Sequence, residues 1–151
     1  MEISVRSVAP EDHTVWQMLW QGYLTFCDSA LEPEVTSHLW QQFFHDHKIM
    51  HAFVIENNQG QVCGFAHCVL HPNTWSVLPC CYLEDLYVAP ESRGKGYASA
   101  LIKHVQKFAQ AVPCNRLYWV SKRDNEPANK LYNQLAQCTD FIQFRIPLNA
   151  S

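Results

Sequence analysis

Residues 93–99 combine basic side chains, glycines and the start of a helix, a combination that suits an anionic phosphate group. Arg93 and Lys95 flank Gly94, and Gly96 directly precedes an amphipathic segment over residues 97–112. Glycines let successive N–H groups point into one concavity, and the positive end of the following helix attracts anions. The alternative is a purely structural strand-to-helix turn. A Walker loop is absent, and the dinucleotide pattern G-x-G-x-x-G fails at Ser99.

The surrounding pattern predicts an α/β fold, a mixed sheet with helices on its faces. Apolar runs bounded by turn residues predict strands, and apolar residues at helical spacing predict helices. The last helix is expected to be capped by Asn125. The expected strands are 2–8, 52–56, 62–70, 80–88, 116–121 and 141–146, and the expected helices start near residues 10, 33, 97 and 126. The whole chain, 1–151, is expected to form one domain.

Three motifs in this framework carry a family resemblance. Arg93-x-x-Gly96-x-Ala98 matches a pyrophosphate loop, the strand before it reads Leu-Glu-Asp-Leu-Tyr-Val-x-Pro over 83–90, and Asn125-x-x-Ala128-x-x-x-Tyr132 follows the next strand. With these motifs the chain resembles the GNAT superfamily of acyl-CoA N-acyltransferases over nearly its whole length. The ending 139–145 is similar to fungal histone and D-amino-acid acetyltransferase homologues. Residues 64–66, Trp75 and 83–85 are similar to polyamine (diamine) acetyltransferases.

The resemblance implies a GNAT-like domain with four helices and a mixed, mostly antiparallel sheet of about six to seven strands, splayed between strands four and five. It implies acetyl-CoA as cosubstrate in that notch, with its pantetheine amides paired to the backbone of residues 86–88. Asn125 would help hold the cofactor or cap the following helix. The implied cofactor-binding residues are Leu86, Tyr87, Val88, Arg93, Gly94, Lys95, Gly96, Tyr97, Ala98, Ser99 and Asn125.

Transfer of an acetyl group to an amine, as the resemblance implies, poses two proton problems. An alkyl ammonium with a pKa near ~10.4 must lose a proton before it can attack. Glu84 is the candidate base and Asp85 the second candidate, the alternative for either being an ordinary surface acid. Strand neighbours face opposite ways, so only one reaches the notch unless a bulge intervenes. The resemblance makes Tyr132 the general acid for the leaving thiolate; its alternative role is a core aromatic.

The acceptor site is expected to involve Tyr23, Asp28, Glu32 and Trp75, in segments that border the acceptor mouth in relatives. The acids suit a cationic amine, and Trp75 could add a cation–π contact; solvated loop positions are the alternative. His45, His47 and His51 have a spacing that could suggest a metal, with His47 and His51 on one helix face. No cysteine or carboxylate clearly completes that set, so a surface helix end and no metal are expected.

Composition and charge limit the classes of protein to which the chain could belong. Hydrophobic residues make up 48% of the chain, enough for a core, and no apolar run approaches the ~20 residues of a membrane span. Seven cysteines without a C-x-x-C pair are expected to be mostly buried and reduced. Residues 1–90 hold ten acids against Arg6 and Lys48, whereas residues 91–130 hold eight bases against three acids. The opposite charges suit a ligand with an anionic and a cationic part, although scattered solvated charge is the alternative.

The expected function is acetylation of a primary amine of a small molecule, a polyamine or an amino acid. Acetylation of protein lysines or N-termini, and a CoA-binding regulatory module without turnover, are the alternatives. The net charge of −3 disfavours a nucleic-acid partner. No membrane partner is expected, a homodimer is possible, and the start of the chain lacks the layout of a secretory signal, so a cytoplasmic location is expected.

Overall fold

The computed structural model describes residues 3–148. The chain divides into two compact units, one reaching to Val120 and the other beginning at Ser121. Glu2, the first residue of the expected strand 2–8, and the two ends of the domain expected over 1–151 lie outside the described residues.

The first unit contains a five-stranded sheet in the order β1-β2-β3-β4-β5. Its strands are β1 (Ser4–Ser7), β2 (Met50–Glu56), β3 (Val62–His71), β4 (Cys80–Val88) and β5 (Arg116–Tyr118). The first four pair antiparallel, whereas β5 runs parallel to β4. The expected bounds of β4 are confirmed. The count of six to seven strands is wrong, because the described residues form five.

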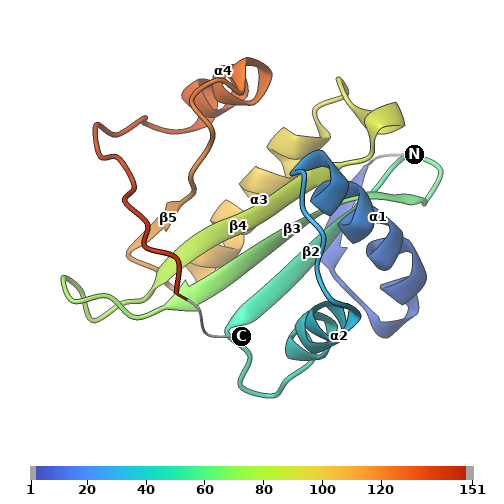
Figure 1. Cartoon of the computed structure of the whole chain (residues 1–151), viewed down its shortest axis with the longest axis horizontal. Helices are drawn as coiled ribbons and strands as arrows, with labels where there is room; N and C mark the ends of the chain where they lie inside the picture. Colours follow the sequence, from blue (N-terminus) through green and yellow to red (C-terminus); the bar gives the residue numbers. More distant parts are fainter. Residues whose placement is uncertain (1–2, 149–151) are drawn as a thin grey trace. The chain divides into compact units, whose positions relative to one another are not determined.

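Helices cover both faces of this sheet (Figure 1). The short 3-10 turn η1 (Pro10–Asp12) leads into α1 (His13–Phe26), which with α2 (Pro33–Gln42) lies on one face, and α3 (Tyr97–Ala111) lies on the other. A second 3-10 turn, η2 (Pro90–Ser92), connects β4 to the glycine turn. Buried residues of α1, including Trp16, Trp20 and Leu24, pack with Phe43 and Phe65 in the core. The sequence predicts a helix that starts near residue 97, and α3 starts at Tyr97.

The second unit holds α4 (Glu126–Leu135), the fourth of the four expected helices. The strand expected over 141–146 is absent: residues 137–148 contain no strand, and Phe141, Phe144 and Ile146 are exposed. Alternating apolar residues suit a pleated strand, but a strand also needs a hydrogen-bonded neighbour. Within residues 121–148 no other strand is present to supply one.

The pairing of β4 with its two neighbouring strands is irregular in two places. The register between β3 and β4 shifts between His67 and Cys68, which marks a β-bulge. On its other side, β4 pairs with β5 only over Cys80–Tyr82, although β4 continues to Val88. The second half of β4 therefore has no paired β5 residue, as expected of a sheet that splays at this point.

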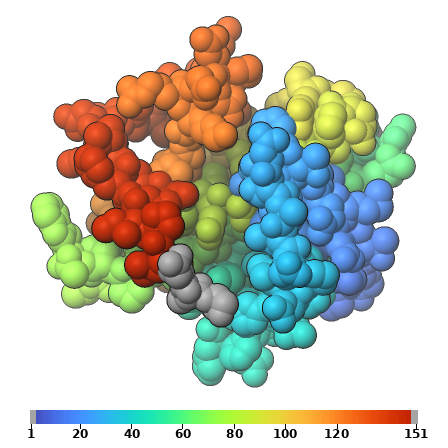
Figure 2. Space-filling view, viewed as in Figure 1, coloured from blue at the N-terminus to red at the C-terminus, as the bar shows by residue number. Residues whose placement is uncertain are grey.

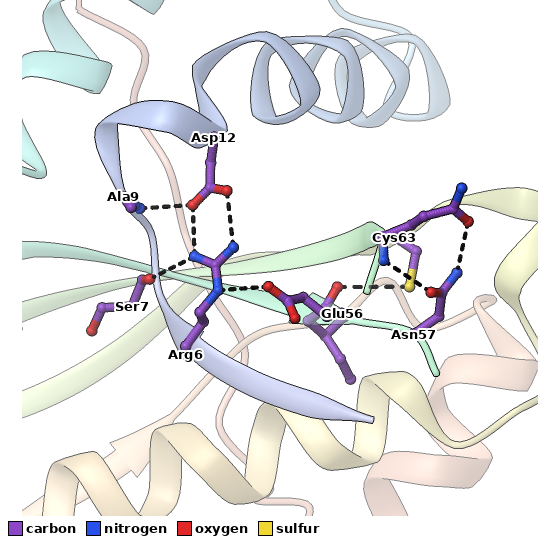
Figure 3. Close-up of polar contacts among 9 residues, drawn as sticks. Arg6, Ser7, Ala9, Asp12, Glu56, Asn57 and Cys63 are labelled. Atoms are coloured by element: carbon purple, nitrogen blue, oxygen red, sulfur yellow. Dashed lines mark hydrogen bonds and ion pairs between the residues drawn. The ribbon is translucent and has the colours of Figure 1, made fainter. Parts of the chain in front are cut away.

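Arg6 connects β1, η1 and β2 (Figure 3). Its guanidinium donates to both carboxylate oxygens of Asp12, at 2.7 and 3.0 Å, and to Glu56 at 2.8 Å. Asp12 also accepts a hydrogen bond from the Ala9 N–H. The Arg6 side chain holds the pKa of Asp12 below its usual range, because the hydrogen bonds favour the carboxylate. The cluster thereby fixes where α1 begins.

The histidines considered as metal ligands do not share a helix. α2 ends at Gln42, His45 and His47 lie in the following turns, and His51 lies in β2. A spacing of four residues, as between His47 and His51, fits one face of a helix. The spacing alone does not show that the segment is helical. Among residues 3–148, no group of three or more His, Cys, Asp or Glu side chains is arranged to hold a metal ion.

Candidate active site

The bulge in β4 is the local feature that places the two acids. Asp85 pairs with His67 and Leu83 pairs with Cys68, so Glu84 is the extra residue between two consecutive pairs. An extra residue interrupts the alternation of side chains along a strand. From the sequence, only one of the two acids is expected to reach the notch unless a bulge intervenes, and such a bulge lies at Glu84.

Glu84 is the more solvent-accessible of the two acids. Nearby groups nevertheless remove enough water from its carboxyl group to raise its pKa, and the adjacent charge of Asp85 raises it further. A carboxylate with a raised pKa binds a proton more strongly, which makes it a better general base near neutral pH. The environment of Glu84 is thus suited to accept a proton from an ammonium group.

Asp85 is held by a buried histidine. His67 Nδ1 lies 3.0 Å from Asp85 Oδ2, and Trp16 Nε1 donates to His67 Nε2 at 3.0 Å. His67 is only 3% exposed and lies between aromatic rings of α1 and β3. One oxygen of Asp85 is therefore engaged by the protein itself, which distinguishes this acid from Glu84.

Tyr23 of α1 also lies close to Asp85. Its ring meets Phe65 and Tyr87 edge to face, with centroids 5.8 and 5.9 Å apart. Burial raises the pKa of the Tyr23 phenol, and the neighbouring Asp85 carboxylate raises it further. The sequence placed Tyr23 near the acceptor and Asp85 in the catalytic set, and the structure brings these two residues together.

The turn before α3 has the backbone that a diphosphate site needs. Gly94 and Gly96 have φ angles of 77° and 81°, and a Cβ added at either would meet no atom within 4 Å. Open space therefore lies beside both glycines. Gly96 is the N-cap of α3, and the first-turn N–H groups at Tyr97, Ala98 and Ser99 have no acceptor within a helix. These residues fit the diphosphate of coenzyme A.

Arg93 does not extend from this turn as a free charge. Its Nε donates to the Val88 carbonyl at 3.0 Å, and its guanidinium lies 5.4 Å from the ring centroids of both Phe26 and Tyr87. Gly22, Thr25 and Phe26 face Tyr87 and Arg93 across an open cavity of about 460 Å³. Arg93 and Lys95 are both exposed.

Helices α1 and α2 border the site within the first unit. The side chains of both helices close over their face of the sheet, and yellow-green atoms in the colour of β4 stay visible beside them (Figure 2). α1 runs along β3 and β4, since Trp16 contacts His67 of β3, Tyr23 contacts Tyr87 of β4, and Phe26 contacts Arg93 after β4. The site is therefore a strip along β4 bordered by α1.

The other expected acceptor residues are spread out. Asp28 follows α1 with a φ of 53°, Glu32 is the N-cap of α2, and both are exposed. Trp75 is 96% exposed in the loop between β3 and β4, where its backbone N–H donates to the Asn73 side-chain oxygen Oδ1. This loop precedes the first residue of β4, whereas the glycine turn follows the last, so Trp75 and the turn lie at opposite ends of the strand.

Asn125 and Tyr132 lie in the second unit. Asn125 occupies the N-cap position of α4, where its carbonyl accepts from the Asn129 N–H while its side chain makes no capping bond. Tyr132 lies on α4 one turn after Ala128, and burial raises the pKa of its phenol. A phenol that keeps its proton at neutral pH is in the state that a general acid requires.

Sequence reasoning overlooked His67 and Trp16. A polar residue inside the buried strand segment 63–68 was the available signal, because a buried polar group needs a hydrogen-bond partner. The partner itself could not be deduced, since Trp16 lies 51 residues away in the chain.

Comparison with known proteins decides the family. The acetyltransferase (GNAT) family model matches residues 13–136. The chain belongs to the GNAT acetyltransferase family. It is accordingly an acetyl-CoA-dependent N-acetyltransferase, and the family resemblance seen in the sequence is confirmed.

Two relatives found by sequence agree with this assignment, and one solved structure shares the fold. The D-amino-acid N-acetyltransferase HPA3 of Saccharomyces cerevisiae is 31% identical over 144 residues, covering 95% of this chain and 89% of that protein. A thialysine N-epsilon-acetyltransferase of Bos taurus is 43% identical over 54 residues, covering 36% of this chain and 32% of that protein. The structure of AAC(6')-Iy, in complex with a CoA bisubstrate analogue, superposes with a TM-score of 0.79 at 19% identity, covering 98% of this chain and all of that one.

No helix among residues 3–148 is both long and apolar enough to cross a membrane.

Proposed function

We propose that this acetyltransferase acts on a primary amine of a small molecule, either a polyamine or an amino acid. The observation that carries the proposal is the pair of acids at the bulge of β4, where the strand has lost its pairing with β5. Two neighbouring carboxyl groups attract a cationic amine, and the raised pKa of Glu84 suits the removal of its proton. Two relatives found by sequence bear names of amino-acid acetyltransferases, which supports the same substrate class.

Acetyl-CoA supplies an activated acetyl thioester when it is bound. Backbone groups of Leu86, Tyr87 and Val88 would hold its pantetheine arm, and the N–H groups from Gly94 to Ser99 its diphosphate. Residues 86–88 have no paired β5 neighbour, so this part of the strand fits an extended ligand with amide groups.

Proton transfer is assigned to two side chains. Glu84 accepts the proton that the ammonium group must lose, and the resulting amine attacks the thioester directly within a ternary complex, without a covalent acyl-enzyme. Tyr132 gives its proton to the departing thiolate. The raised pKa of the Tyr132 phenol keeps that proton available at neutral pH.

An amine panel tests the substrate class. Thiol release from acetyl-CoA is measured with polyamines, with D- and L-amino acids and with a lysine-containing peptide, at neutral and alkaline pH. We expect a higher kcat/KM for at least one small amine than for the peptide. A peptide preference would contradict the small-molecule assignment, and CoA binding without any thiol release would indicate a regulatory module.

Assembly and location stay predictions. A homodimer stays one possible assembly, and light scattering during gel filtration measures the mass directly. The cytoplasmic location expected from the sequence is tested by fractionation of the producing cells.

A further inference from the structure

The direction of the hydrogen bonds from Trp16 to Asp85 follows from donor chemistry. An indole N–H can only donate, so His67 Nε2, 3.0 Å from Trp16 Nε1, must accept. A neutral imidazole then carries its one proton on Nδ1, and this nitrogen lies 3.0 Å from Asp85 Oδ2. The Nδ1–H therefore donates to the Asp85 carboxylate.

Packing holds the imidazole in this orientation. Its ring stacks on Phe65 with centroids 4.5 Å apart, and Phe43 and Trp20 lie at 4.9 and 5.2 Å. Turning the ring over would place the carbons Cδ2 and Cε1 where Nδ1 and Nε2 now meet Asp85 and Trp16, so both hydrogen bonds would be lost. Because His67 is 3% exposed, water cannot readily compensate for such a change.

We propose that His67 is a positioning residue that keeps the Asp85 carboxylate oriented beside Glu84, and so strengthens Glu84 as the base. This inference rests on the proposed function, in which Glu84 removes the proton of the amine. His67 touches neither reacting group; it acts through Asp85.

His67 acts on Glu84 through the charge of Asp85. A negative neighbour raises the pKa of Glu84. Without the Nδ1–H of His67, the Asp85 carboxylate would lose the hydrogen bond that fixes it beside Glu84, and its charge would act less strongly on Glu84. Two other titratable groups face the pair: Tyr23 of α1 hydrogen-bonds Asp85, and Tyr118 of β5 lies near Glu84. Neither occupies the position of the His67 Nδ1–H.

The first test identifies the protonated nitrogen of His67. Long-range ¹H–¹⁵N NMR of the intact wild-type protein distinguishes a protonated ring nitrogen from a bare one, and the signals of His67 are assigned as those lost in His67→Asn. We expect the proton on Nδ1 and none on Nε2 near neutral pH. A proton on Nε2, or a doubly protonated ring, would overturn the proposal without any activity measurement.

The second test uses the pH profile of kcat/KM with the best small amine. His67→Phe keeps a flat ring but removes the donor, so we expect kcat/KM to fall about tenfold and the rising limb to move to lower pH. Asp85→Asn should move the limb in the same direction. His67→Asn retains an N–H at the position of Nδ1 and should keep the limb near its wild-type place.

A matched substitution on the neighbouring strand controls for packing. His51 of β2 lies against Phe108 and outside this network, so His51→Asn should leave the profile unchanged. A folded His67→Phe variant with an unmoved limb would reduce His67 to a packing residue. If His67→Phe fails to fold, the wild-type NMR result decides. Absence of turnover in the wild-type enzyme would instead contradict the proposed function.

Discussion

At the scale of single residues, Glu84 and Asp85 are adjacent in the chain but differ in their surroundings. Asp85 receives a hydrogen bond from buried His67, whereas Glu84 is the extra residue of the bulge and has a raised pKa. Pairs of acids whose environments separate their proton affinities commonly divide the work of catalysis. We therefore assign proton removal to Glu84 and electrostatic support to Asp85.

Glu84→Gln should lower kcat/KM by about 100-fold, because general base catalysis contributes at least that much in many enzymes. Since the base works only when deprotonated, the wild-type rate should rise as pH rises through the pKa of Glu84. Gln cannot titrate, so the variant should lose this rising limb. A variant profile that keeps the limb would leave the base unidentified.

Tyr132→Phe should lower kcat about 100-fold while the Kd for coenzyme A stays similar, because only the phenol proton is removed. Calorimetry measures cofactor affinity and thiol release measures turnover. The helix position and aromatic ring are retained, so folding should be unaffected. An unchanged kcat would remove Tyr132 from the mechanism.

At the scale of elements, the decisive unit is the succession β4, glycine turn and α3. Gly94 and Gly96 adopt φ angles that side chains rarely accept, and open space adjoins both. The conformation directs backbone N–H groups rather than side chains toward the space where an anion would bind. Gly60 in the turn between β2 and β3 has a similar φ of 76° and equally open surroundings, but it lies outside this succession.

Gly96→Ala and Gly60→Ala form a matched pair. Each should destabilise the protein by about 1 kcal/mol, because alanine is strained at positive φ. Only Gly96→Ala should also weaken coenzyme A binding, by roughly tenfold, since a distorted turn misdirects the N–H groups. Thermal unfolding and calorimetry provide the two measurements. Equal cofactor affinity in both variants would contradict the diphosphate site at this turn.

At the scale of the molecule, the Arg6 cluster fixes the first unit's edge strand to the start of α1. Arg6 bridges Asp12 and Glu56, which lie 44 positions apart in the sequence, through charge-assisted hydrogen bonds. α1 in turn contributes Trp16 and Tyr23 to the candidate site. The stability of this distant cluster therefore supports the geometry of the catalytic strip.

Asp12→Asn should lower the free energy of unfolding at pH 7 by about 1–2 kcal/mol, through loss of charged hydrogen bonds. The folded pKa of Asp12 is depressed, so its stabilisation is present above the ordinary value of 3.8 and disappears as pH falls through the folded value. Urea unfolding at pH 7 and in acid should show the gap between wild type and variant closing in acid. Asp46→Asn, at an exposed turn, serves as the control.

Local patterns in the sequence were sufficient for the elements whose signals lie within a few residues. The bounds of β4, the start of α3 at Tyr97 and the glycine turn follow from apolar periodicity and from the special backbone of glycine. The family followed from motifs of the same short range. Local signals failed where pairing was required: residues 141–146 alternate like a strand but form none among the described residues.

The tertiary structure alone decided how the two acids differ. The bulge at Glu84 depends on the register with β3, and the Asp85 partner His67 is oriented by Trp16 from another element. Hydrogen bonds and desolvation act between groups that are distant in the chain, so no spacing rule contains them. The residue types in the sequence determined which chemistry is available, and the folded neighbourhood determined which residue is placed to perform it.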